Sequence, residues 1–209
     1  MTRILIADDH SVVRKGVRQI LAEEIPAVYI EEAENAAELI KKVVLDDWHV
    51  VISDLTMPGK SGLEALQEIK QLKPQLPVLI LSIHPEEQYA IRALKAGASG
   101  YLRKDTIPDE LVQAVQKVLT GKKYITVSIA EKIADAFNSG SDKLPHELLS
   151  DRELNVFKML AAGKAVSEIA DSLSLSVTTV STYRSRIMTK MNMRTNAHLT
   201  LYAMEHGML

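Results

Sequence analysis

Short apolar runs alternate with segments of helical periodicity over the first 120 residues of this chain. The runs are rich in Val, Ile and Leu, and they predict strands at Ile4–Ala7, Val28–Ala33, Val50–Ser53, Val78–Leu81 and Ser99–Leu102. The segments between and after them predict helices near residues 11–23, 36–46, 62–72, 86–96 and 108–120. Because strictly alternating strands and helices form a parallel sheet with helices on both faces, we expect an α/β domain with a parallel five-stranded sheet.

The alternation stops after Gly121. One more short helix is predicted from Ser128 to Phe137, and the turn-forming residues Asn138–Pro145 follow it as a linker. Beyond the linker the pattern is helical. We therefore predict an α/β domain at 1–122, a linker with a short helix at 123–147, and an all-α domain at 148–209.

Four helices are predicted in the last domain. Ser150-Asp151-Arg152-Glu153 is a capping box, in which Ser and Glu each satisfy an unpaired backbone N–H, and Gly163 ends this first helix. The others are expected at Val166–Leu173, from Ser176 onward, and from about Thr195 to Gly207. A short helix, a tight turn and a longer helix are typical of the helix-turn-helix motif, although a plain four-helix bundle would show the same capping and periodicity.

The composition is that of a globular protein, because 46% of the residues are hydrophobic and 25% are charged. No apolar run approaches the length that spans a bilayer, and the chain turns acidic at Asp8 and Asp9, where a signal peptide would stay apolar. We therefore expect a cytoplasmic protein with no membrane partner. The absence of cysteine excludes disulfides and thiolate chemistry, so any metal would be held by oxygen or imidazole.

The two parts of the chain carry charge of opposite sign. Residues 1–142 contain 17 Lys and Arg against 21 Asp and Glu, whereas residues 143–209 contain 8 against 6. The run from Ser172 to Met204 has no acidic residue, and it holds Arg184, Arg186, Lys190 and Arg194. A basic stripe on an otherwise neutral segment is typical of a surface that meets a phosphate backbone. The simpler alternative, a solvated helix face, would normally mix both signs of charge, so the pattern favours nucleic acid.

Polar side chains stand at the carboxyl ends of four predicted strands. Asp8 and Asp9 follow the first strand, Asp54 the third and Ser82 the fourth, and Lys104 comes after the fifth. Because parallel sheets bind ligands beyond the carboxyl ends of their strands, these five side chains are expected to meet in one pocket.

Three carboxylates in one pocket cannot all stay ionised unless a cation joins them, and an oxygen-only cluster suits Mg²⁺. A carboxylate beside that metal, with a lysine and a hydroxyl opposite, can attack a phosphoryl group and hold the oxygens of the product. Taken singly, each residue could be a helix cap, a turn former, a strand end or a solvated charge. Their occurrence together favours a site that carries a phosphoryl group on an aspartate.

Residues 1 to about 120 resemble the receiver domains of two-component signalling, through Ile6–His10, Asp54–Gly62, Leu81–Ser82 and Ala96–Asp105. The resemblance implies a flavodoxin-like (βα)5 fold and a phosphoacceptor, Asp54, that takes phosphate from a sensor histidine kinase. It also implies that Asp9, Asp54 and the backbone carbonyl of Thr56 bind Mg²⁺ directly, while Asp8 helps through water.

The same resemblance implies roles for the remaining pocket residues. Ser82 and Lys104 would contact the phosphoryl oxygens. Tyr101 would turn between outward and inward rotamers when the hydroxyl of Ser82 moves to the phosphate, although plain strand packing is compatible with its position. Thr56 and His84 would flank the line of water attack and set the lifetime of the acyl phosphate.

The third helix of the last domain has two contrasting faces. One stripe contains Val177, Val180, Arg184, Ile187 and Met191, and the opposite face contains Thr178, Thr182, Ser185 and Thr189. A surface helix usually fills such a face with Glu, Lys and Gln, so small polar residues there indicate that a partner approaches closely.

Residues 148–209 resemble the LuxR-type DNA-binding domain of NarL/FixJ-type response regulators, through Leu149–Glu153, Ala162–Gly163, Glu168–Leu173, Leu175–Ser176 and Thr179–Met188. The resemblance implies that the helix from Val177 to Met191 enters the major groove and that the last helix supports dimerisation. Ala165 stands where a capping Ser or Thr is frequent, and Ser181 where a base-contacting Lys is frequent. We expect Thr178, Ser181, Thr182 and Ser185 at base edges, and Arg184, Arg186 and Lys190 mainly at phosphates.

The sequence is therefore interpreted as a transcription regulator, not an enzyme, in which phosphorylation controls a homodimer that binds double-stranded DNA. An alternative is a phosphoaspartate hydrolase or phosphotransferase, which would need a substrate cleft and an acid or base that only His84 offers. A second alternative is a helical module that binds a protein or an RNA. The acid-free segment 172–204 argues against a purely protein partner.

Overall fold

The computed structural model describes residues 1–84, 86–138 and 144–209. The chain divides into two compact units, Met1–Ser139 and Gly140–Leu209. The predicted linker Asn138–Pro145 falls at this division, and its residues 139–143 lie outside the described part of the chain.

The first unit is built on a five-stranded sheet in which every pairing is parallel. Its spatial order is β2-β1-β3-β4-β5, and the strands are β1 (Thr2–Ala7), β2 (Val28–Ala33), β3 (Val50–Asp54), β4 (Val78–Ser82) and β5 (Gly100–Arg103). The register pairs Ala7 with Ser53, Asp54 with Leu81, and Ser82 with Arg103. The carboxyl ends of β1, β3, β4 and β5 therefore lie at one edge, which confirms the predicted fold class.

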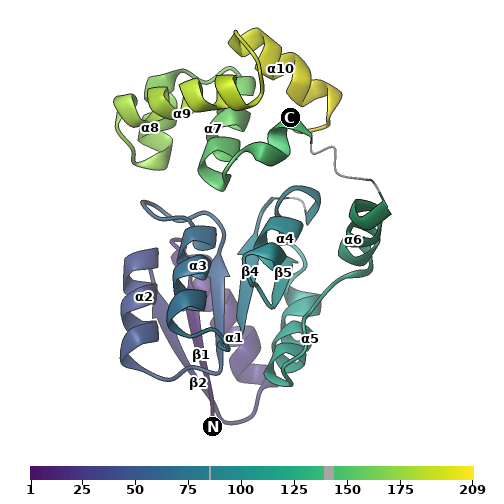
Figure 1. Cartoon of the computed structure of the whole chain (residues 1–209). Helices are drawn as coiled ribbons and strands as arrows, with labels where there is room; N and C mark the ends of the chain where they lie inside the picture. Colours follow the sequence, from purple (N-terminus) through teal and green to yellow (C-terminus); the bar gives the residue numbers. More distant parts are fainter. Residues whose placement is uncertain (85, 139–143) are drawn as a thin grey trace. The chain divides into compact units, whose positions relative to one another are not determined.

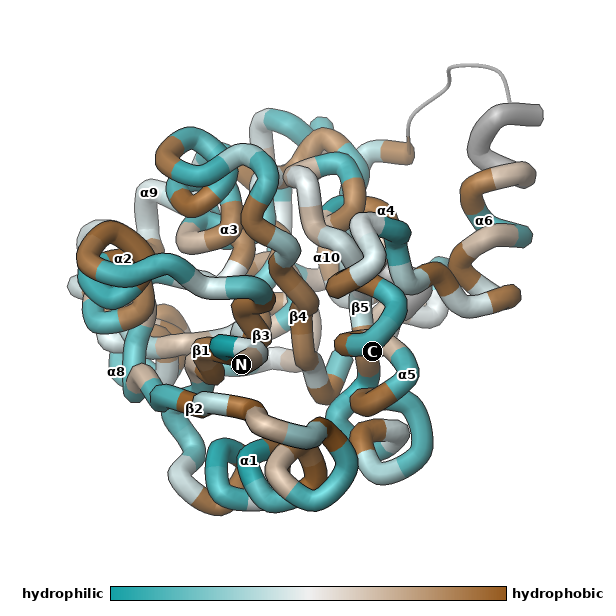
Figure 2. Tube along the Cα trace, turned by 90° about the horizontal axis from the view of Figure 1, so that it is seen from below, coloured by the Kyte–Doolittle hydropathy of each residue, from teal (hydrophilic) through white to brown (hydrophobic). Residues whose placement is uncertain are grey.

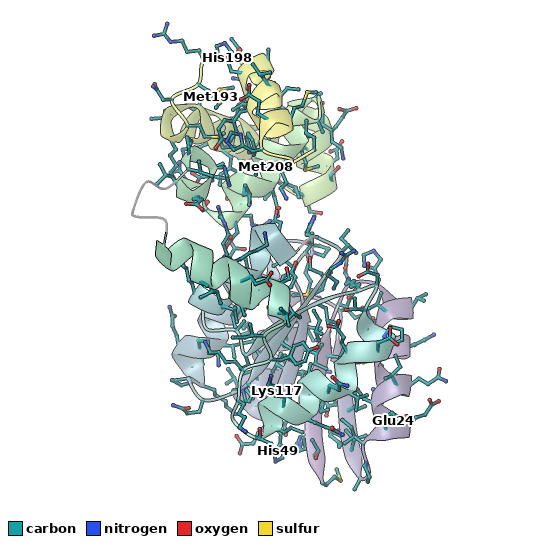
Figure 3. The ribbon with its side chains drawn as sticks, turned by 90° about the vertical axis from the view of Figure 1, so that its right-hand side faces the viewer. Glu24, His49, Lys117, Met193, His198 and Met208 are labelled. Carbon is teal, nitrogen blue, oxygen red and sulfur yellow. The ribbon has the colours of Figure 1, made fainter. Side chains whose placement is uncertain are left out.

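Helices cover both faces of this sheet (Figures 1 and 2). One face is covered by α1 (Ser11–Glu24) and α5 (Ile107–Leu119), and the other by α2 (Ala36–Leu45), α3 (Gly62–Leu72) and α4 (Glu86–Lys95). Because both faces are covered, β3 and β4 are buried along their whole length, and each begins with an apolar run before the polar residues at its carboxyl end. Figure 3 labels Glu24, His49 and Lys117 at the end of this unit where helices finish and strands begin.

The chain leaves α5 along the exposed edge of β5. Tyr124 donates its backbone N–H to the carbonyl of Ser99 (2.7 Å) and forms a parallel bridge with Gly100. Gly100 permits this approach, because a Cβ there would lie 2.9 Å from the Tyr124 carbonyl oxygen and 2.8 Å from Leu79 Cδ2. After this bridge, α6 (Val127–Asn138) packs against α4.

The second unit is helical (Figure 1). It contains the 3-10 helix η1 (Pro145–Leu148), α7 (Asp151–Ala161), α8 (Val166–Leu173), α9 (Val177–Lys190) and α10 (Asn196–Glu205). The predicted capping box starts α7, since Glu153 Oε2 accepts from the N–H of Ser150 (2.7 Å), and Gly163 follows its end at φ +84°. Within the described residues, no helix is both long enough and apolar enough to cross a membrane.

Candidate functional sites

Three carboxylates and one imidazole meet at the carboxyl edge of the sheet. Asp8 and Asp9 follow β1, and Asp54 ends β3. Ligand atoms of Asp8, Asp9, His10 and Asp54 all lie within 4.8 Å of one another. Asp8 and Asp54 are buried, whereas Asp9 and His10 are exposed. The structure thus brings together the three acidic residues expected from the sequence and adds His10, whose Nδ1 lies 2.8 Å from Asp9 Oδ1.

Lys104 completes the pocket from the far side. Its Nζ lies 2.7 Å from Asp8 Oδ2 and 3.0 Å from Asp54 Oδ2. Burial alone would lower the pKa of Lys104, but the carboxylates of Asp54 and Asp8 raise it above its usual value. One ammonium therefore pairs with two of the three carboxylates, and the third, Asp9, lies beside His10.

This donor set fits a divalent cation such as Mg²⁺. Hard cations prefer oxygen ligands, and a partly solvated site also lets Mg²⁺ keep several of its waters. Asp9 faces the solvent, and Thr56 lies two residues beyond Asp54 at an exposed position. The backbone N–H of Thr56 donates to the Asp54 carboxylate, so the loop after β3 lies against the same group that would face the metal.

The pKa of Asp54 is raised from its ordinary value of 3.8 to about 6, because burial and the charge of Asp8 raise it by more than Lys104 and the N–H of Thr56 lower it. A buried carboxylate of this kind is costly to ionise without a metal. A strongly shifted pKa is also typical of carboxylates in functional sites, where the group takes part in the chemistry.

We expect Asp54→Asn to stabilise the metal-free protein near neutral pH. The folded pKa of Asp54 lies above its unfolded value, so the folded state binds the proton more tightly, and wild-type stability falls as pH rises from about 4 to about 6. Asparagine does not titrate. In EDTA, urea denaturation should give the variant a free energy of unfolding about 1–3 kcal/mol above wild type at about pH 7.5, and little gain near pH 4. A gain of the same size at both pH values would contradict the assignment.

The loop after β4 connects the pocket to Tyr101. Ser82, which ends β4 and is buried, accepts a hydrogen bond at Oγ from the N–H of His84 (2.9 Å). Tyr101 of β5 is fully buried and donates its hydroxyl to the carbonyl of His84 (2.9 Å). The ring of His84 also packs against that of Tyr89 in α4, with centroids 4.9 Å apart. One short loop thus joins the pocket hydroxyl, the inward-facing Tyr101 and α4.

Gly62 shapes the other side of the pocket, and sequence reasoning assigned it no role. A Cβ at Gly62 would lie 1.9 Å from the carbonyl oxygen of Asp54, so the chain returns onto the end of β3 only with glycine at this position. Gly62 also donates its N–H to the carbonyl of Leu55 (2.9 Å). The available signal was the Ser61-Gly62 pair at the start of an apolar helix, which marks a turn but not a close approach.

The second candidate site is the exposed face of α9. Val180 and Ile187 of this helix and Met191 just after it are buried, as the periodicity predicts. The small polar residues on the other side are all exposed, namely Thr178, Ser181, Thr182, Ser185 and Thr189. The left-handed Ser174 (φ +52°) makes the turn between α8 and α9, and those two helices pack together. This is the helix-turn-helix arrangement, and the exposed face of its second helix, α9, carries these small polar side chains.

The three cationic side chains of α9 differ in their contacts. Lys190 Nζ lies 2.6 Å from Oε2 of Glu153, whose side chain is 4% exposed, and Arg184 Nε donates to Asn196 Oδ1 (2.9 Å). Arg186 is exposed and forms no ion pair with any described residue. The sequence grouped the three as phosphate contacts; two of them also hold α9 against α7 and α10.

Two large apolar side chains of α10 are exposed. Leu201 and Met204 are 57% and 65% exposed, while Leu199 and Ala203 are buried on the inner side. Tyr202 hydrogen-bonds to Nδ1 of His146 (2.8 Å), which ties η1 to this helix. Figure 3 labels His198 near the start of α10 and Met208 beyond its end.

The fold and the two sites define a two-domain protein in which a parallel α/β domain with an acidic pocket precedes a helix-turn-helix domain. Residues 4–116 match the response regulator receiver domain, and residues 147–203 match the bacterial regulatory proteins of the luxR family. This chain belongs to the two-component response regulators with a LuxR-type DNA-binding domain, the NarL/FixJ family, whose members are transcription regulators.

Similar proteins span the whole chain. Response regulator GacA of Pseudomonas protegens is 37% identical over 210 residues, covering 100% of this chain and 98% of that protein. Response regulator UvrY of Escherichia coli strain K12 is 34% identical over 209 residues, with coverage of 100% and 96%. The solved structure of RcsB from Salmonella enterica serovar Typhimurium, bound to promoter rprA with the phosphomimetic BeF3-, is 29% identical with a TM-score of 0.65 and covers 97% of this chain and 98% of its own.

Proposed function

We propose that a cognate sensor histidine kinase phosphorylates Asp54, and that the phosphorylated protein forms a homodimer that binds specific double-stranded DNA in the cytoplasm. The observation that carries the proposal is the position of Asp54, buried at the sheet edge with Asp8 and Asp9 on one side and Lys104 3.0 Å away on the other. The proposed domains are a receiver at 1–122, a linker with a short helix at 123–147, and a DNA-binding domain at 148–209.

The chemistry follows from this arrangement. An ionised oxygen of Asp54 attacks the phosphorus of a phosphohistidine, the P–O bond of an aspartyl phosphate forms, and the P–N bond breaks with its electrons returning to the imidazole. Asp9, Asp54 and the Thr56 carbonyl would hold Mg²⁺ directly and Asp8 through water. When bound, Mg²⁺ neutralises the charge of the carboxylates and of the phosphoryl oxygens.

The response to phosphorylation involves the residues beside Asp54. A phosphoryl group adds about 1.5 to 2 negative charges near neutral pH, which attract the ammonium of Lys104 and the hydroxyl of Ser82. Ser82 would then release the His84 N–H that its Oγ accepts now, and the loop that holds Tyr101 and contacts Tyr89 would move. Thr56 and His84 would control the lifetime of the phosphate.

The output is proposed for the second domain. The exposed Thr178, Ser181, Thr182 and Ser185 would face base edges in the major groove, with Arg186 at its rim, while Arg184 and Lys190 would reach phosphates from positions that also brace the domain. The two exposed apolar side chains of α10 support dimerisation, because Leu201 and Met204 would be covered by a second copy. RcsB, a related protein of similar structure, has been solved as two dimers bound to two parallel DNAs.

We expect Lys104→Ala to separate phosphorylation from response. The variant should accept phosphate from acetyl phosphate more slowly than wild type, because one cation beside the transferring group is lost. It should then dimerise only weakly, as measured by light scattering at matched phosphate occupancy. Arg103→Ala is the control, since Arg103 is the exposed neighbour that pairs with Asp105. If phosphorylated Lys104→Ala dimerised as tightly as wild type, Lys104 would have no part in the switch.

A further inference from the structure

We propose that Arg14 is a positioning residue for the acidic pocket, one that fixes the β1–α1 loop so that Asp8 and Asp9 present their carboxylates to Mg²⁺. This inference rests on the proposed function, because it concerns the metal site of the same pocket. Arg14 lies in the first turn of α1, directly after the loop that carries the two aspartates.

The guanidinium of Arg14 is almost completely buried, with its side chain 7% exposed. It donates to three different groups: Nη1 to the backbone carbonyl of Asp8 (2.7 Å), Nε to Glu32 Oε2 (3.0 Å) and Nη2 to Glu34 Oε1 (2.8 Å). Arginine is rarely buried unless its donors are satisfied, and its planar fork fits several acceptors in fixed directions. The side chain therefore links the end of β1 rigidly to the end of β2.

The contact with Asp8 is made at the peptide group that joins the two aspartates. The N–H of Asp8 is held by the carbonyl of Ala33 at 3.2 Å, and its carbonyl is held by Arg14. Asp8 and Asp9 share that peptide plane, so a rotation of its carbonyl would redirect the Cα–Cβ bond of Asp9 relative to that of Asp8. Fixing this carbonyl therefore fixes the spacing between the carboxylates of Asp8 and Asp9. In other metal sites, residues that hydrogen-bond to the ligands orient them in the same way.

Glu32 provides the fixed end of this link. Burial alone would raise the pKa of Glu32, but hydrogen bonds from Arg18 and Arg14 hold it below its ordinary value, so the carboxylate stays ionised. Arg18 pairs with the other oxygen, Nε to Oε1 at 2.7 Å, and also donates to the carbonyl of Ile30 (3.0 Å). Arg18 shares the anchor of Arg14 but lacks its contact with Asp8, which makes it a matched control.

The test compares Arg14→Met with Arg18→Met in the full-length protein. Both substitutions remove a guanidinium from Glu32, and only the first removes the donor to the Asp8 carbonyl. Isothermal titration with Mg²⁺ alone should show about tenfold weaker binding for Arg14→Met, within the range seen when residues that hydrogen-bond to metal ligands are removed. For Arg18→Met the Mg²⁺ affinity should change by less than about twofold. The rise in melting temperature from EDTA to saturating Mg²⁺ should fall only for Arg14→Met, whereas a general loss of stability would lower both temperatures equally.

Arg14→Lys covers the case in which Arg14→Met does not fold. Lysine keeps the charge and can reach one acceptor, so Mg²⁺ binding should lie between that of wild type and a tenfold loss. The inference would be overturned if a folded Arg14→Met bound Mg²⁺ as tightly as wild type. If Arg14→Met does not fold, wild-type affinity in Arg14→Lys would overturn it. Equal losses of Mg²⁺ affinity in the Arg14 and Arg18 variants would also overturn it. Failure of the wild type itself to bind Mg²⁺ would instead overturn the proposed function.

Discussion

Replacement of Asp54 by asparagine is expected to abolish the incorporation of phosphate from acetyl phosphate and Mg²⁺. The neutral amide has no anionic oxygen to attack phosphorus. Asp8 and Asp9 are not expected to substitute for it, because they follow β1 and are assigned to the metal, whereas Asp54 ends the central strand β3. Intact-mass spectrometry should show the gain of one phosphoryl group in wild type and none in Asp54→Asn. Peptide mapping should place the group on Asp54.

The control for this experiment is Asp47→Asn. The Asp47 side chain is fully exposed and pairs with Lys73, away from the pocket. This variant should incorporate phosphate at the wild-type rate. Phosphate mapped to another residue while Asp54 is intact would contradict the proposed chemistry.

The second large effect is expected from substitutions on the exposed face of α9. Loss of a residue that contacts bases and loss of one that contacts phosphates should change DNA binding in different ways. Thr182→Ala should change the preferred base sequence, with about 1–3 kcal/mol lost at one base pair of each half-site. Arg186→Ala should weaken binding to all duplexes alike and reduce the slope of log affinity against log salt by about 1. Fluorescence anisotropy with a set of duplexes at several salt concentrations measures both quantities.

Lys122→Ala, which removes an exposed cation from the first unit, should change neither quantity. If Arg186→Ala instead relaxed discrimination at one base pair and left the salt slope unchanged, Arg186 would belong to base readout. If no α9 substitution affected duplex binding, this helix would not be the DNA-binding element.

The sequence predicted the elements that have a strong period, and these position the pocket. Alternating apolar runs located all five strands, and because parallel strands end at one edge, Asp8, Asp9, Asp54 and Lys104 could be expected together. The capping box at Ser150 likewise marked the start of α7. The 3-10 helix η1 was not predicted, since four residues are too few to show a period.

Contacts between residues far apart in the chain could not be predicted in the same way. Lys190 pairs with Glu153 across 37 positions of the sequence, and Arg14 reaches Glu32 across 18. Each pairing depends on how two helices, or a helix and a strand, pack together, and no local pattern encodes that geometry. For this reason Lys190 was predicted only as a phosphate contact, and Arg14 was given no role.

The central claim is that the state of Asp54 controls the affinity of the protein for DNA. Its most direct test measures the affinity of wild type and Asp54→Asn for one operator duplex at fixed salt, before and after treatment with acetyl phosphate and Mg²⁺. We predict at least a fivefold rise for wild type, about the smallest usual allosteric coupling, and no change for Asp54→Asn. Unchanged affinity of fully phosphorylated wild type, or the same rise in Asp54→Asn, would contradict the claim.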